Sequence, residues 1–142
     1  MREIKFRAWD EELKKMYDGE EMESREDIHA WLSYGTLAIY RVEDGNYEEL
    51  KELQFTGLKD KNGVEIYEGD IVEENEQYAV CCWIDEVASF AFVPIEVFPA
   101  KDFITIHETY GLDTFFRNDV PEQFVDVIGN IYEHPHLLEV SL

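Results

Sequence analysis

The stretch from residue 54 to residue 72 constrains the fold most strongly, because three glycines interrupt it. Gly57, Gly63 and Gly69 fall within thirteen residues, and glycine adopts backbone conformations that strain other residues. Asn62 before Gly63 forms a dipeptide typical of tight hairpin turns in which both central residues have positive φ. We therefore expect short strands joined by corners of defined shape, with a second corner at Glu68-Gly69-Asp70.

The two-residue alternation typical of half-buried strands recurs along the rest of the chain. It is clearest at the start, where Ile4, Phe6 and Ala8 alternate with charged residues. Strands are predicted from this pattern, or from β-branched and aromatic content, at 3–9, 16–17, 36–42, 50–55, 71–72, 78–84, 88–93, 103–107 and 124–132. Asp44-Gly45 and Asp85-Glu86 are predicted turns, and Gly129 indicates a bend or bulge. Pro94 and Pro99 interrupt an apolar run, so residues 95–98 are expected at an edge or in a loop. Residues 111–122 are expected to be irregular, and the leucines at 137 and 138 to tie down the terminal segment.

One segment, residues 25–34, has the pattern of a short amphipathic helix. Ser24 followed by Asp27 resembles a capping box, and Gly35 stands where a helix usually ends. Three apolar residues follow one another at helical spacing and would form a stripe: Ile28, Trp31 and Leu32. We expect this helix to cover a sheet.

Together these features predict a mainly β protein, a small barrel or sandwich with an N-terminal strand and short-helix extension. No repeat and no linker-like composition divides the chain. We therefore expect one domain over residues 1–142, with an N-terminal β/α part over 1–50 and a barrel part over 51–142.

The chain carries 33 acidic and 12 basic residues, for a formal net charge of −21. This charge argues against direct binding to nucleic-acid phosphates or to an anionic membrane. Residues 62–142 contain seventeen of the acids and two of the bases, which is typical of a solvated surface. The chain contains no long apolar run and does not begin with an export signal, so we expect it in the cytoplasm.

Motifs that would indicate catalysis or a cofactor are missing from the sequence. It contains neither a glycine-rich phosphate loop nor a G-x-S-x-G elbow. The adjacent Cys81 and Cys82 are expected to be reduced and to face opposite sides of a strand, and no basic neighbour would activate either thiol. His134 and His136, next to Glu133, are the candidate metal ligands, but their spacing presets no geometry. We therefore expect no enzyme activity, no cofactor and no metal.

Three parts of the sequence resemble the YopX family, small proteins carried by phages and prophages of bacteria. They are residues 1–10, residues 54–63 with 66–72, and residues 127–133 with Pro135 and Leu137-Leu138. The resemblance implies an SH3-like barrel and residence in the cytoplasm of a bacterial host, and it leaves homo-oligomers open. It supplies no catalytic or ligand-binding residues. In the family, Asn and Glu are common where this chain has His134 and His136, which weakens the metal hypothesis further.

The central motif has an interpretation that needs no ligand. Glycines permit the turns, Tyr67 supplies an apolar anchor, and Asp70 accepts backbone N–H bonds. The residues expected to have this structural role are Gly57, Asn62, Gly63, Tyr67, Gly69 and Asp70.

Three functions remain open from the sequence. The first is a non-catalytic protein-interaction or accessory module encoded by a phage or prophage, with an unknown protein partner. Most of the aromatic residues are expected in the core, but some would form an exposed patch for such a contact. The second is an acidic mimic of DNA that inhibits a host or phage DNA-binding protein. The third is an enzyme or small-ligand binder whose site the sequence does not reveal.

Overall fold

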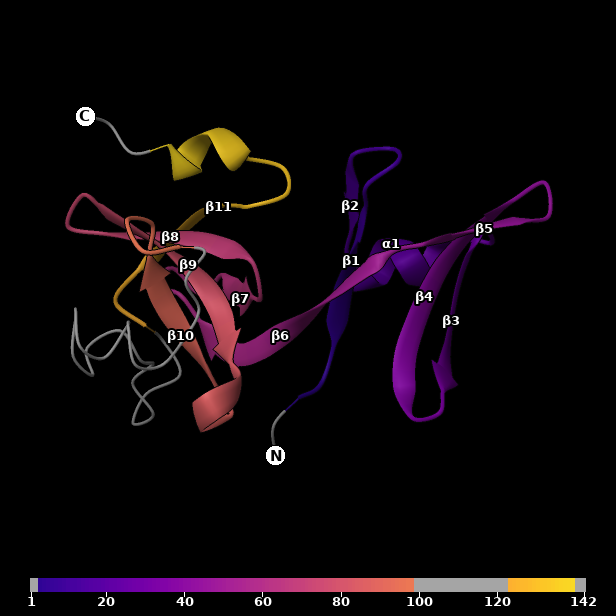
Figure 1. Cartoon of the computed structure of the whole chain (residues 1–142), viewed down its shortest axis with the longest axis horizontal. Helices are drawn as coiled ribbons and strands as arrows, with labels where there is room; N and C mark the ends of the chain where they lie inside the picture. The colour runs from indigo at the N-terminus through magenta and orange to yellow at the C-terminus, as the bar shows by residue number, and fades with distance from the viewer. Residues whose placement is uncertain (1–2, 99–122, 140–142) are drawn as a thin grey trace. The chain divides into compact units, whose positions relative to one another are not determined.

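The computed structural model describes residues 3–98 and 123–139, which are built mainly of antiparallel strands (Figure 1). The chain divides into two compact units, one of Glu3–Gln54 and one of Phe55–Leu142 with Met1–Arg2. The boundary falls within β6 (Lys51–Lys59). The expectation of a mainly β protein with little helix is confirmed.

In the first unit, strands β1 (Phe6–Asp10) and β2 (Lys15–Tyr17) pair with each other, and β1 also pairs with the first residues of β6. A second sheet has the order β3-β4-β5, with β3 at Ile28–Ser33, β4 at Thr36–Glu43 and β5 at Asn46–Glu49. The core of the first unit is formed by four buried residues, which come from both sheets and from the position after β5: Ala8, Tyr17, Ile39 and Leu50.

The prediction of a helix over residues 25–34 is wrong, because β3 occupies most of this segment. Tyr34 and Gly35 both have positive φ, +52° and +84°, and they form the two-residue turn of a hairpin with β4. Gly35 therefore serves the turn and not the end of a helix. The only α-helix among the described residues is α1 (Gly19–Ser24), in an acidic stretch for which no helix was predicted. Asp18 caps α1, since its carboxylate accepts the N–H of Glu21 at 2.8 Å.

In the second unit, the later part of β6 pairs with β7 (Glu65–Tyr67). A four-stranded sheet of order β10-β9-β8-β11 curls into a half-barrel (Figure 1). Its strands are β8 (Asp70–Glu74), β9 (Gln77–Ile84), β10 (Ser89–Pro94) and β11 (Asp126–Asn130). Short 3₁₀ turns lie at Asp85–Val87 and Pro135–Leu138.

Two hydrophobic clusters in this unit use opposite sides of the strands. Cys82 packs with Ile71 and Val80, whereas Cys81 packs with Ile66 and Val72. Both cysteines are buried. The expectation that neighbouring cysteines face opposite sides of one strand is therefore confirmed.

Most predicted strands that fall on the described residues are present. Pro94 ends β10 at the edge of its sheet, and the register of β11 shifts between Val127 and Gly129, which confirms the bulge. Leu137 and Leu138 pack against the cluster around Ile71, as expected. The predicted strand at 103–107 and the irregular segment at 111–122 lie outside the described residues. No helix in the described ranges is long and apolar enough to cross a membrane.

Candidate functional site

The sheet β3-β4-β5 is the candidate functional site, and two tight turns define its register. Tyr34-Gly35 joins β3 to β4, and Asp44-Gly45 joins β4 to β5 with φ values of +50° and +80°. Turns with positive φ at both central residues match the twist of paired strands. They fix Trp31 opposite Ala38 and Val42 opposite Tyr47.

An aromatic row of Trp31, Tyr40 and Tyr47 crosses one face of this sheet. Trp31 on β3 stacks on Tyr40 on β4, with ring centroids 4.8 Å apart and planes at 11°. Tyr40 meets Tyr47 on β5 edge-on, with centroids 6.1 Å apart. Trp31 is 43% exposed and Tyr47 is 64% exposed. The row therefore offers large aromatic surfaces to solvent on a rigid support.

The opposite face of the sheet carries a buried ion pair. Arg41, 3% exposed, donates its Nε–H to Oδ2 of Asp10 at 2.6 Å. The fully buried Asp10 also accepts the hydroxyl of Tyr17 at 3.2 Å and the N–H of Leu13 at 3.0 Å. These bonds satisfy a carboxylate that would be costly to bury alone.

The protonation of this cluster follows from burial and from the arginine. Burial by itself acts to raise the pKa of Asp10, but the hydrogen bonds from Arg41, Leu13 and Tyr17 and the charge of Arg41 together outweigh it, so the pKa is lowered. Burial, reinforced by the charge of Asp10, raises the pKa of Tyr17. The hydrogen bond to Asp10 raises the pKa of Arg41. The pair is therefore ionised at neutral pH.

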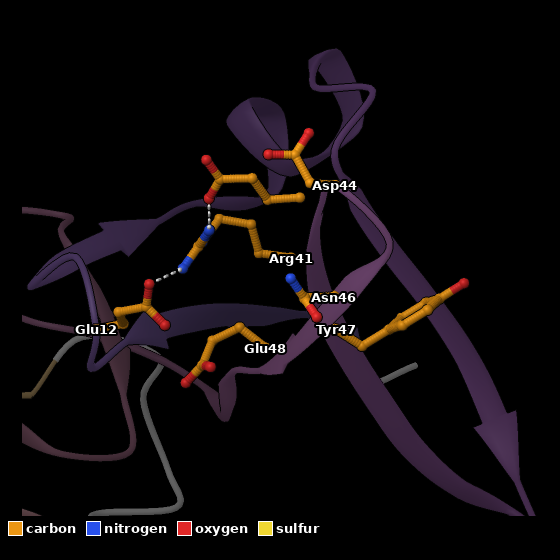
Figure 2. Close-up of a pocket in the computed structure, with 7 residues that line it drawn as sticks. Glu12, Arg41, Asp44, Asn46, Tyr47 and Glu48 are labelled. Atoms are coloured by element: carbon orange, nitrogen blue, oxygen red, sulfur yellow. Dashed lines mark hydrogen bonds and ion pairs between the residues drawn. The ribbon is translucent and has the colours of Figure 1, made fainter.

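A pocket of about 300 Å³ opens beside Arg41 (Figure 2). It is lined by Glu12, Arg41, Glu43, Asp44, Asn46, Tyr47 and Glu48. Figure 2 shows the guanidinium of Arg41 reaching toward Glu12, whereas the ring of Tyr47 points away from the pocket. Burial raises the pKa of Glu48, and the neighbouring Glu12 raises it further.

The contacts of Arg41 define what this pocket can hold. Its Nη1 donates to Glu43 at 3.0 Å and its Nη2 forms an ion pair with Glu12 at 3.4 Å, in addition to the bond to Asp10. The four carboxylates of the lining outnumber its one cation, so the pocket repels phosphate and favours cationic groups. Nowhere in residues 3–98 and 123–139 do three or more His, Cys, Asp or Glu side chains gather to hold a metal ion.

The six residues of the predicted motif lie elsewhere, in the second unit. Gly57 is within β6, where its register with β7 shifts, Tyr67 ends β7 and Asp70 begins β8, and the other three are in turns. Gly57, Gly63 and Gly69 have φ of +88°, +84° and +88°. Asp70 is buried and accepts the N–H of Tyr67 at 2.7 Å, and the ring of Tyr67 lies 5.5 Å from that of Phe55. The structural role of the six residues stays a prediction.

The turn at Asn62-Gly63 differs from the expected one, because only Gly63 has positive φ. The N–H of Gly63 bonds to the carbonyl of Asp60 at 3.1 Å, and the N–H of Asp60 bonds to the carbonyl of Val64 at 2.8 Å. This is a three-residue hairpin loop ending in a left-handed glycine. Asn62 instead donates its side-chain amide to Asp126 at 2.6 Å.

Asp60 organises this loop, although the sequence patterns did not indicate this role. It is 1% exposed, and its carboxylate accepts three backbone N–H groups, from Asn62 at 2.8 Å, Val64 at 2.9 Å and Val127 at 3.0 Å. The signal that was available is an aspartate three residues before a glycine, a common arrangement in turns. The bond to Val127 joins segments distant in the sequence, which local patterns do not reveal.

His134, one of the two candidate metal ligands, accepts a backbone hydrogen bond. His134 accepts the N–H of Asn130 through Nδ1 at 3.2 Å, and its ring centroid lies 6.1 Å from that of His136. Asn130 in turn accepts the N–H groups of Tyr132 and Glu133 through its side-chain oxygen. His134 thus belongs to the network that closes the turn after β11.

This architecture defines a class: a small antiparallel β protein with an exposed aromatic sheet face and an acidic pocket. The chain belongs to the YopX family, because the profile described as YopX protein matches residues 5–139. It is also similar to the crystal structure of protein EF1440 from Enterococcus faecalis, with 26% identity and a TM-score of 0.53. That similarity covers 98% of this chain and 100% of EF1440. Comparison with curated proteins finds no match.

Proposed function

We propose that this chain is a non-catalytic protein-interaction module that binds a basic segment of a partner protein on the aromatic row. The observation that carries the proposal is the solvent exposure of Trp31 and Tyr47 at the two ends of the row. Aromatic residues are the side chains most enriched where proteins bind one another. Large rings left open to water on a monomer indicate such a contact.

Charge defines the chemistry of the partner. A Lys or Arg side chain is attracted to the face of an indole or phenol ring, by about 0.5–1 kcal/mol at exposed sites and more when water is excluded. Glu49 is paired with Tyr40 and shares its face, and Asp44 lies at the adjoining turn. With a net charge of −21, the molecule attracts basic chains and repels acidic ones.

Two finer points of this proposal rest on family membership. We propose an SH3-like barrel for the second unit, supported by the curled sheet β10-β9-β8-β11 and its two hydrophobic clusters. We also propose that the protein acts in the cytoplasm of a bacterium that carries a phage or prophage. Family membership supports this setting.

The test measures binding of a fluorescein-labelled twelve-residue peptide that alternates arginine with small apolar residues. We expect fluorescence anisotropy to show binding that weakens with salt, and the double variant W31A/Y47A to lose at least about tenfold in affinity. Trp83→Ala is the matched control, because Trp83 is an exposed tryptophan on β9 in the second unit. It should bind like the wild type.

The double variant also separates this function from imitation of DNA. W31A/Y47A keeps every charge, so an inhibitor that acts through its charge alone would keep its affinity for a basic groove. If the double variant binds the arginine peptide as tightly as wild type, or if Trp83→Ala loses as much, the aromatic row is not the binding surface. A peptide with glutamate in place of arginine should not bind.

A further inference from the structure

Strand β3 is an edge strand without the features that usually prevent pairing with another chain. β3 lies at the end of the order β3-β4-β5, and residues 28–33 contain no Asp, Glu, Lys or Arg. Its residues are exposed except for Ile28, which is half-buried. An unpaired edge of this length presents a row of backbone donors and acceptors to any compatible strand.

The other edges in the described part of the chain are protected. β2 and β7 have three residues each, and β5 has four, two of them glutamates. β11 contains a bulge and Asp126. β10 is largely buried and ends in Pro94. Short length, charge, proline and bulges are the devices that proteins use against edge-to-edge pairing. Only β3, among the described edges, combines length, exposure and lack of charge.

The free backbone groups of β3 can be assigned from its pairing with β4. Val42 donates its N–H to the carbonyl of Asp27 at 2.7 Å, so residue 27 faces β4. Because this direction alternates along an antiparallel strand, His29, Trp31 and Ser33 also face β4. Ile28, Ala30 and Leu32 direct their N–H and C=O groups away from the sheet.

We infer that β3 pairs with β3 of a second copy of this chain, antiparallel and centred on Trp31. Backbone hydrogen bonds between the two copies form only in registers that place a residue whose N–H and C=O groups point away from the sheet opposite another such residue. In the register centred on Trp31, Ala30 bonds to Leu32 of the second copy. The two Trp31 side chains then form a pair without backbone hydrogen bonds between them, in which cross-strand side chains are closest.

Pairing with a second copy is compatible with the net charge of −21, because few acids lie near β3. The acids nearest to β3 are Glu26 and Asp27. In the register centred on Trp31, both lie beyond the end of β3 of the second copy, because that chain turns back to β4 at Tyr34-Gly35. No like charges are opposed within the paired segment. Residues directly opposite in a sheet share a face, so the two aromatic rows join into a single row of six rings on one side of a six-stranded sheet.

The test is sedimentation equilibrium on the full chain, with Ala30→Pro as the main variant. Proline lacks an N–H, but that of Ala30 faces away from β4, so the β3–β4 ladder keeps its bonds. We expect wild type to have twice the monomer mass of 16.8 kDa at tens of micromolar, and Ala30→Pro to be monomeric. Ala30→Val, which retains the N–H, should dimerise like wild type. Leu32→Lys, which places a charge on the edge, is a second disrupting variant should Ala30→Pro not fold.

Salt separates this pairing from binding of a basic peptide. Screening weakens the repulsion between two acidic copies but also weakens the attraction of a basic segment, so added salt should tighten the dimer and loosen the peptide complex. A wild type that stays monomeric at about millimolar concentration overturns the inference. So does a folded Ala30→Pro or Leu32→Lys that dimerises as well as wild type, or a mass above that of a dimer.

Discussion

Arg41 and Asp10 form an ion pair that is buried although the two residues are 31 positions apart in the chain. The pair joins β1 to β4 within the first unit, and Tyr17 and Leu13 complete the bonding of the carboxylate. Breaking such a pair leaves a charge without a partner in a region that excludes water. This cost is much larger than the benefit of an exposed pair.

Arg41→Met should therefore lower the free energy of unfolding by about 3–5 kcal/mol. Urea denaturation followed by circular dichroism measures it. The matched control is Arg25→Met, because Arg25 pairs with Asp27 on the surface of the same unit, and its effect should be much smaller. Similar losses for both variants would mean that the Asp10 pair contributes no more than a surface contact.

Acid should weaken the same unit through Asp10. Its pKa is lower in the folded protein than in the unfolded chain, where it is near 3.8. The stabilisation is therefore fully present above about pH 4 and is lost as the pH falls through the folded-state pKa. We expect the free energy of unfolding to fall more steeply below about pH 4 in wild type than in Asp10→Asn. Equal slopes would contradict this assignment.

Asp60→Ala should destabilise the second unit by about 2–4 kcal/mol, because three backbone N–H groups lose their charged acceptor. Asp60→Asn keeps one acceptor oxygen and should lose less. Glu74→Ala, which removes an exposed acid at the end of β8, is the control for net charge. Chemical denaturation of the three variants ranks their free energies of unfolding. An Asp60→Ala variant as stable as Glu74→Ala would exclude the structural role of Asp60.

Gly69 and Gly63 provide a comparison between two glycines with similar φ. A Cβ on Gly63 would meet nothing within 4 Å, whereas one on Gly69 would lie 3.0 Å from Cε2 of Tyr132. Gly63→Ala should cost about 1–2 kcal/mol from backbone strain alone. Gly69→Ala should cost more, since Tyr132 must also move. The melting temperatures of the two variants measure this difference. If Gly69→Ala lowers the melting temperature less than Gly63→Ala does, the side chain of Tyr132 moves aside at little cost.

The thiols of Cys81 and Cys82 should not react with a thiol reagent in the native protein. Both side chains are buried, in separate hydrophobic clusters. Two equivalents should react once the protein is unfolded in denaturant, as absorbance titration would show. Rapid reaction of the native protein would contradict their burial.

Much of the fold was predictable because the signals are local. Alternation along residues 78–84 located β9 and the two faces used by Cys81 and Cys82. The dipeptide Asp44-Gly45 located a hairpin turn. In each case, the conformation depends on a few adjacent residues and on burial of one strand face.

The segment at 28–33 shows where local signals fail. Ile28, Trp31 and Leu32 fit one face of a helix by spacing alone, but β4 pairs with this segment and Tyr34-Gly35 returns the chain. Tertiary pairing outweighed a helical pattern that was only ten residues long. The aromatic row could not be predicted either, because it combines residues of three strands whose registers the turns define. The exposure of Trp31 was hidden for the same reason.

Strand β6 has a practical consequence for anyone who shortens this protein. Residues 51–54 supply the backbone partners of Phe6 to Trp9 in β1, so a fragment that stops at Leu50 uncovers the edge of β1 that faces β6 and leaves it prone to aggregate. A fragment that extends to Gln54 retains those partners. Four residues therefore decide whether the N-terminal half can be prepared by itself for crystallisation or spectroscopy.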